Sequence, residues 1–176
     1  MSGRVLVACV GNVLRHDDGF GVAVAEALAR DGLPEGVDLI ETGIGGMSVV
    51  QQLMDGYDAL IVVDAVDRSA APGTVWVLDP EVPEPEAVDP DAWRALFSNL
   101  HLAEPYRILL LARSLRVLPP LVRLVGCQPL DVDAMAEGLS APVAAAVPVA
   151  AGQVRRLAIA AVDGSASVAP ATALVG

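Results

Sequence analysis

The chain has 176 residues, a length that suits one folded domain with its own hydrophobic core. Hydrophobic residues make up 54% of the sequence and aromatic residues only 3%, so the core must be built from aliphatic side chains. The net charge of −11 argues against a nucleic-acid-binding protein, which needs a basic surface. No apolar run reaches the roughly 18 residues of a membrane span, and no signal-peptide cleavage site is visible. We therefore expect a soluble, cytoplasmic protein that is monomeric or associates weakly.

Apolar runs and helical spacings alternate along the chain. Short runs rich in β-branched residues predict five buried strands, at residues 4–10, 37–41, 59–66, 73–78 and 121–127. Apolar residues at helical spacing predict four helices, at residues 17–30, 47–54, 104–118 and 140–162. This alternation is typical of an α/β fold with three layers (αβα), in which a mostly parallel, twisted five-stranded sheet has helices on both faces.

Two segments fall outside this pattern. Residues 79–92 contain six acidic residues, four prolines and no basic residue, which predicts an exposed loop; it either shapes access to a site or is a solvated spacer. Residues 164–176 form a low-complexity tail rich in Ala, Ser and Val that we expect to be loosely held. The single domain is thus expected to span residues 1–163. Cys9 and Cys127 lie in apolar runs and are expected to be buried reduced thiols, with a disulfide or a metal pair as the alternative.

Ligands of doubly wound sheets bind beyond the carboxyl ends of the strands, so acidic residues at those ends are candidate site residues. Asp64 lies within an otherwise aliphatic strand, where a carboxylate is costly unless it is hydrogen-bonded, paired or bound to a metal. Asp17 and Asp18 follow the first strand, where they could equally serve the first turn of a helix. If the first and third strands are neighbours, Asp18 and Asp64 face one crevice. The alternative for Asp64 is a structural carboxylate that binds a loop backbone.

His101 follows the acidic loop and would complete a set of two carboxylates and one imidazole, although a loop histidine is often only a surface residue. Three such ligands leave coordination positions open, and their donor atoms suit nickel, zinc or manganese. Other chemistries lack their motifs. The glycine-rich turn at residues 43–46 has no following Lys-Ser/Thr, the chain has no Gly-x-Ser-x-Gly elbow, and residues 10–14 lack the glycines of a dinucleotide fingerprint.

Residues 11–22, Gly-Asn-Val-Leu-Arg-His-Asp-Asp-Gly-Phe-Gly-Val, resemble the opening motif of the [NiFe]-hydrogenase maturation endopeptidases, Gly-Asn-x-Leu-x-x-Asp-Asp/Glu-x-x-Gly. Later features keep the order of that family: the turn at 43–46, the Val63-Asp64-Ala65 strand and the position of His101. Residues 139–143, Leu-Ser-Ala-Pro-Val, are similar to the segment that opens the last helix, with one additional residue. The resemblance covers about residues 4–160.

The resemblance implies an endopeptidase that removes the C-terminal extension of a hydrogenase large-subunit precursor after nickel has been inserted. It implies that Asp18, Asp64 and His101 bind the nickel that the substrate carries, and that Asp17 has a supporting role. For the hydrolysis itself, the metal could polarise the peptide carbonyl or activate water. Alternatively Asp17, Asp18 or Asp64 could act as the general base, as in an aspartyl protease. A non-catalytic nickel-binding accessory protein of hydrogenase maturation is the alternative function.

Overall fold

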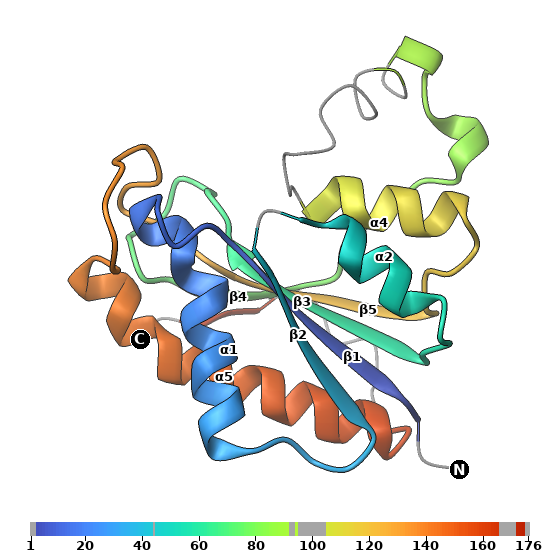
Figure 1. The fold of residues 1–176 in the computed structure, drawn as a ribbon, viewed down its shortest axis with the longest axis horizontal. Helices are drawn as coiled ribbons and strands as arrows, with labels where there is room; N and C mark the ends of the chain where they lie inside the picture. Colours follow the sequence, from blue (N-terminus) through green and yellow to red (C-terminus); the bar gives the residue numbers. More distant parts are fainter. Residues whose placement is uncertain (1–2, 44, 92–93, 95–104, 166–171, 175–176) are drawn as a thin grey trace.

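The fold is a three-layer αβα sandwich, described here from a computed structural model that covers residues 3–43, 45–91, 94, 105–165 and 172–174 (Figure 1). Six strands form one sheet in the order β2-β1-β3-β5-β4-β6. Their bounds are β1 Val5–Val10, β2 Val37–Gly43, β3 Ala59–Ala65, β4 Val75–Leu78, β5 Leu121–Cys127 and β6 Thr172–Leu174. β1, β2, β3 and β5 are parallel, whereas β4 is antiparallel to both of its neighbours.

All five strands expected from the sequence are present, and a sixth is added. β6 comes from the tail that was expected to be loosely held, and it pairs with β4 at the sheet edge. The missed strand has a simple cause, because Thr172-Ala173-Leu174 is too short and too mixed to give an alternation signal. The four expected helices also form, as α1 Phe20–Asp31, α2 Met47–Leu53, α4 Pro105–Ser114 and α5 Ala141–Val162.

The two faces of the sheet bury separate aliphatic cores. Odd-numbered residues of the central strands, such as Val7 and Val63, pack against α1 and α5, and even-numbered ones, such as Leu60 and Val62, pack against α2 and α4. Figure 1 shows these helix pairs on opposite sides of the sheet. All six residues of β1 are buried, as expected for a central parallel strand that is covered on both faces.

One difference from the expected elements matters for the site. The helix expected from residue 17 begins only at Phe20, because residues His16–Gly19 form a separate 3-10 turn. The acidic loop is largely exposed over residues 79–91, as expected, and contains a second short 3-10 turn, Pro85–Ala87. Glu84 in this loop pairs with Arg113 of α4 at 2.7 Å. Cys9 and Cys127 are buried free thiols, as expected.

α5 is the one helix in the described part of the chain that is long and apolar enough to cross a membrane, judged by length and composition alone. No uninterrupted apolar run of that length was expected, because Arg155 and Arg156 interrupt the apolar sequence in the second half of the helix. Its inner residues, including Val143, Ala150 and Val154, are fully buried in the core between the sheet and α1.

Candidate functional site

The site lies where the chain changes direction in the sheet. From β1 the chain moves to one side to form β2, then returns to form β3 on the other side of β1, so the connections diverge between β1 and β3. Ligands of doubly wound folds bind at such a switch point, beyond the carboxyl ends of the strands. Asp64 lies at this end of β3, and Asp18 lies in the turn that follows β1. The expectation that the first and third strands are neighbours is confirmed.

Close backbone packing places Asp18 at the end of β1. The Asn12 N–H donates to the Asp18 carbonyl at 3.1 Å, and the Asp18 N–H donates to the Arg15 carbonyl at 3.0 Å. A Cβ atom on Gly11 would lie 2.2 Å from the Asp18 carbonyl oxygen, and one on Gly21 would lie 2.0 Å from the Val10 carbonyl oxygen. Only glycine allows approaches this close, so the two motif glycines let the start of α1 sit directly against the strand ends.

Asp64 is held within the sheet itself. Its backbone pairs with Gly126 of β5, and its side chain is only 6% exposed. Within the described residues, the one hydrogen bond of its carboxylate is the 2.8 Å bond that Oδ1 accepts from the Ala65 N–H. That single local bond does not fit a carboxylate that holds a loop backbone, which was the structural alternative for Asp64. The side chain points to the α2 and α4 face, as do the other even-numbered residues of β3.

The charge of Asp18 acts on the carboxyl group of Asp64. Burial raises the pKa of Asp64 well above its usual range, and the nearby charge of Asp18 raises it further, against the hydrogen bond from Ala65. Burial also raises the pKa of Asp18, while Arg15 and the Asn12 backbone oppose this rise. Two like charges that are partly withdrawn from water repel each other, and a bound cation removes this cost. The pair is therefore suited to receive a metal ion.

Asp17 lies next to Asp18 in sequence but has different surroundings. Its side chain is fully buried and accepts four hydrogen bonds. Its donors are the Leu130 N–H at 2.8 Å, the Asp131 N–H at 3.1 Å, the Ser140 N–H at 2.7 Å and the Ser140 hydroxyl at 2.8 Å. Burial opposes the charged form, but these bonds outweigh it and lower the pKa of Asp17. The contacts favour a structural role, in which Asp17 ties the β5–α5 loop to the site.

Ser140 and Gln128, to which the sequence assigned no role in the site, support this end of the sheet. Ser140 is the N-cap residue that precedes α5, and its hydroxyl donates to Asp17. Gln128 follows β5, and its Oε1 accepts the Arg68 and Ala70 N–H groups while its Nε2 donates to Asp67. The position of Gln128, a polar residue directly after a buried strand, was the feature of the sequence that could have predicted this role.

The proposed third ligand, His101, lies outside the described residues. Among the residues that the structure does describe, no group of three or more His, Cys, Asp or Glu side chains is arranged to hold a metal. The described part of the site is thus a pair of carboxylates.

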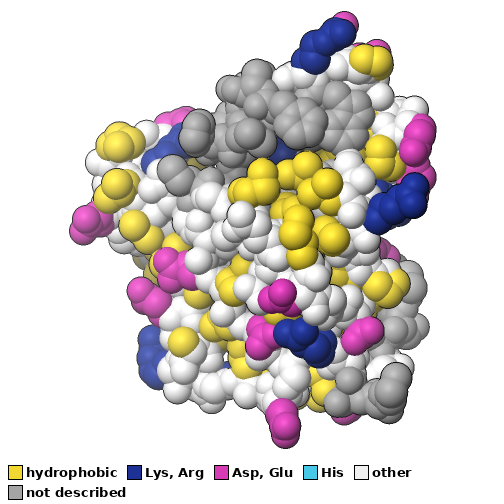
Figure 2. Space-filling view, turned by 45° about the vertical axis from the view of Figure 1, so that its right-hand side comes forward, with side chains coloured by type: hydrophobic (Ala, Val, Ile, Leu, Met, Phe, Trp, Pro, Cys, Tyr) yellow, Lys and Arg dark blue, Asp and Glu magenta, His cyan; other side chains and the backbone are white. Residues whose placement is uncertain are grey.

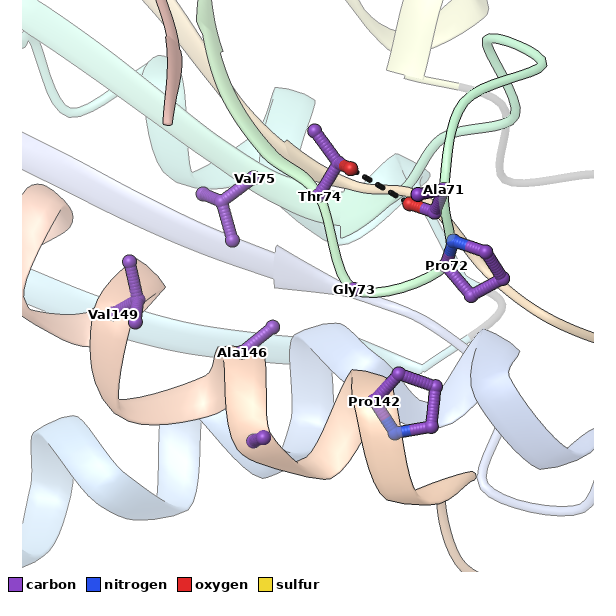
Figure 3. A pocket seen from close by; sticks show the side chains of 9 residues that line it. Ala71, Pro72, Gly73, Thr74, Val75, Pro142, Ala146 and Val149 are labelled. Atoms are coloured by element: carbon purple, nitrogen blue, oxygen red, sulfur yellow. Dashed lines mark hydrogen bonds between the residues drawn. The ribbon is translucent and has the colours of Figure 1, made fainter. Parts of the chain in front are cut away.

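A pocket of about 370 Å³ lies near this end of the sheet but on the α5 face (Figure 3). It lies between the turn at residues 71–75 and the first turns of α5, with Gly73 and Pro142 facing one another. Its lining contains no titratable side chain, and the Thr74 hydroxyl is already bonded to the Ala71 carbonyl at 2.7 Å. This pocket therefore offers none of the chemistry of the carboxylate pair.

Comparisons with known proteins show the family to which the chain belongs. The sequence model of the HycI family, described as hydrogenase maturation protease, matches residues 22–156. The hydrogenase expression/formation protein HupD of Rhizobium leguminosarum bv. viciae is 36% identical over 149 residues, which are 84% of this chain and 70% of that protein.

Solved structures agree as well. The hydrogenase maturating endopeptidase HybD from E. coli is 32% identical, with a TM-score of 0.67 over 97% of this chain and 96% of that one. The hydrogenase 2 maturation peptidase from Thaumarchaeota archaeon SCGC_AB-539-E09 is 34% identical, with a TM-score of 0.61 over 86% of this chain and 95% of that one. The chain shares its α/β fold with these peptidases, and its own carboxylate pair lies at the switch point of that fold. The chain belongs to the hydrogenase maturation protease family.

Proposed function

We propose that this protein is the endopeptidase that removes the C-terminal extension of a [NiFe]-hydrogenase large-subunit precursor once that precursor carries nickel. The observation that supports this proposal is the pairing of Asp18 with Asp64 at the switch point. Both carboxylates are partly or fully withdrawn from water, and the charge of one raises the pKa of the other. A cation that arrives with the substrate would remove the repulsion between the two carboxylates and so favour binding.

In this proposal nickel is cargo of the substrate, held by the precursor's own ligands. Asp18 and Asp64 contribute carboxylate oxygens to it, and His101 contributes a ring nitrogen. A precursor without nickel leaves the two like charges uncompensated and binds weakly, so the enzyme selects loaded precursor by a difference in affinity. The nickel also fixes the scissile peptide bond next to the site, and such positioning accelerates hydrolysis.

The hydrolysis requires polarisation of the peptide carbonyl and removal of a proton from water. The substrate's nickel supplies the first as a Lewis acid. For the second, Asp17 is a poor general base because all four of its hydrogen bonds come from Leu130, Asp131 and Ser140, and its side chain is fully buried. A base on this chain must face the substrate, so the step falls to a carboxylate oxygen of Asp18 or Asp64 that is not bound to the nickel.

Intact-mass spectrometry tests this proposal. The cognate large-subunit precursor is incubated with the protein, with and without prior nickel loading, and in parallel with the Asp64→Asn variant. We expect loss of a C-terminal peptide only from the loaded precursor and only with the unmodified protein. A stable complex without any change in mass would instead support the nickel-binding accessory protein.

A further inference from the structure

The two edges of the sheet differ. At one edge β4 is covered by β6, which comes from the chain's own tail. At the other edge β2 pairs with β1, and no further strand of the described residues pairs with its outer side. An open strand edge presents unpaired backbone groups that can accept a strand from another chain.

The hydrogen bonds between β1 and β2 identify the backbone groups of β2 that face away from the sheet. The Val5 N–H donates to the Gly36 carbonyl at 2.9 Å. Because inward and outward groups alternate along a strand, Asp38 and Ile40 bond β1, whereas the N–H and C=O of Leu39 and Glu41 point away from it. Both residues lie in the half of β2 that leads to the site.

This edge is continuous with the carboxylate pair. β2 ends at Gly43, whose carbonyl accepts the Gly11 N–H at 3.3 Å, and Gly11 in turn packs against the backbone of Asp18. A peptide that leaves the site along the sheet would therefore meet the outer side of β2 first at Glu41 and then at Leu39. Such a peptide runs antiparallel to β2.

The surface beside this edge suits an extended peptide with apolar side chains. Met47 begins α2, which packs on β2, and Met54 directly follows that helix; they are 43% and 59% exposed. Figure 2 turns this side of the molecule forward and shows hydrophobic side chains gathered in one patch near its centre. Methionine side chains adapt to varied partners, and the exposed carboxylate of Glu41 favours a basic side chain opposite it.

We propose that the open edge of β2 binds the C-terminal extension of the substrate as an added antiparallel strand, through the outward backbone groups of Leu39 and Glu41. This inference rests on the proposed function. The folded, nickel-bearing part of the precursor lies at the carboxylate pair, so the chain beyond the scissile bond is the part free to extend along β2. Strands lie about 4.8 Å apart, so this added strand lies roughly 14 Å from β3. Pairing then begins about four to five residues after the scissile bond.

Proline at position 41 tests the proposal. Glu41→Pro removes an outward N–H and leaves the β1–β2 hydrogen bonds intact, since proline is tolerated where the N–H of an edge strand faces solvent. Glu41→Thr is the matched control, because it removes the charge and keeps the N–H. We expect Glu41→Pro to raise KM for the nickel-loaded precursor about tenfold with little change in kcat, and Glu41→Thr to change KM much less. Equal KM values for Glu41→Pro and the unmodified protein would overturn the proposal.

Amide hydrogen exchange on the unmodified protein provides a readout that does not depend on any variant. Binding of the precursor should slow exchange at the Leu39 and Glu41 amides, and a precursor truncated four residues after the scissile bond should lose this protection. Unchanged exchange at both amides would refute the added strand. If the unmodified protein cleaves nothing, the proposed peptidase function fails, while protection at these two amides still reports the docking.

Discussion

The contacts of Asp17 predict that its carboxylate holds the β5–α5 loop against the 3-10 turn His16–Gly19 and so stabilises the fold. We consider Asp17→Asn, which keeps the side-chain shape but removes its charge. Oδ1 accepts one hydrogen bond, from the Ser140 N–H, and Oδ2 accepts three. The new amide nitrogen must replace one of these acceptors, so at least one bond is lost to a donor–donor contact. The remaining bonds change from charge-assisted to neutral, which makes them about half as strong.

These losses set the expected magnitude. A hydrogen bond to a buried charge contributes about 1.5–3 kcal/mol, and the contributions are not additive. We expect Asp17→Asn to lower the free energy of unfolding by about 2–4 kcal/mol, which corresponds to a fall in Tm of about 4–16 °C for a chain of this size. Urea and thermal unfolding, followed by circular dichroism, measure both quantities. Asp133→Ala is the control in the same loop, because it breaks only the exposed 3.3 Å ion pair with Arg15 and should cost less than about 1 kcal/mol.

The effect of Asp17→Asn should also depend on pH. The pKa of Asp17 is lowered in the folded state, so its contribution to stability is complete above the unfolded-state pKa and disappears as the pH falls through the folded-state pKa. The stability difference between the two proteins should therefore be constant near pH 7 and shrink below about pH 4. A difference in the free energy of unfolding of less than 1 kcal/mol at pH 7, or one that grows on acidification, would refute this structural role of Asp17.

Three further predictions concern the rest of the site. Asp64→Asn should abolish processing without loss of stability at pH 8. The pKa of Asp64 is raised in the folded state, so its carboxyl group stabilises the fold fully only below the unfolded-state pKa. This contribution disappears as the pH rises through the folded-state pKa. A variant that melts lower than the unmodified protein at pH 8 would contradict this. Gly21→Ala should lower the free energy of unfolding by about 3 kcal/mol or more, because its Cβ would lie 2.0 Å from the Val10 carbonyl oxygen. The control Gly152→Ala, on the open surface of α5, should raise it by about 0.5–1 kcal/mol. Equal melting temperatures of the two variants would disprove the close approach. His101→Ala should weaken cleavage of nickel-loaded precursor, and full processing would exclude it as a ligand.

Hydrophobic patterning predicted most of the fold, because the central parallel strands β1 and β3 are almost entirely buried and therefore appear in the sequence as continuous apolar runs. β5, expected at residues 121–127, has those bounds in the structure, and β3 differs by one residue. β6 was missed because three residues at an edge carry no periodic signal. The start of α1 was placed too early because acidic residues before an apolar helix are typical of a first turn, whereas Asp17 and Asp18 belong to a separate 3-10 turn.

The site was predicted less completely than the fold. The expected strand order predicted that Asp18 and Asp64 lie near one another, because Asp64 lies at the end of one strand and Asp18 in the turn that follows its neighbour. The separate role of Asp17 could not be predicted, because its partners Leu130, Asp131 and Ser140 are more than 100 residues away in sequence. Only the folded chain shows that adjacent aspartates face different surroundings, one open to a ligand and one saturated with hydrogen bonds.

The central claim is that Asp18 and Asp64 bind the nickel that the precursor carries. X-ray absorption at the nickel edge tests it most directly, on nickel-loaded precursor alone and on the same precursor frozen immediately after mixing with the protein. We predict that mixing adds oxygen or nitrogen ligands to the nickel, and that the Asp18→Asn/Asp64→Asn double variant adds fewer. An unchanged nickel coordination on mixing, with cleavage still proceeding, would contradict the claim.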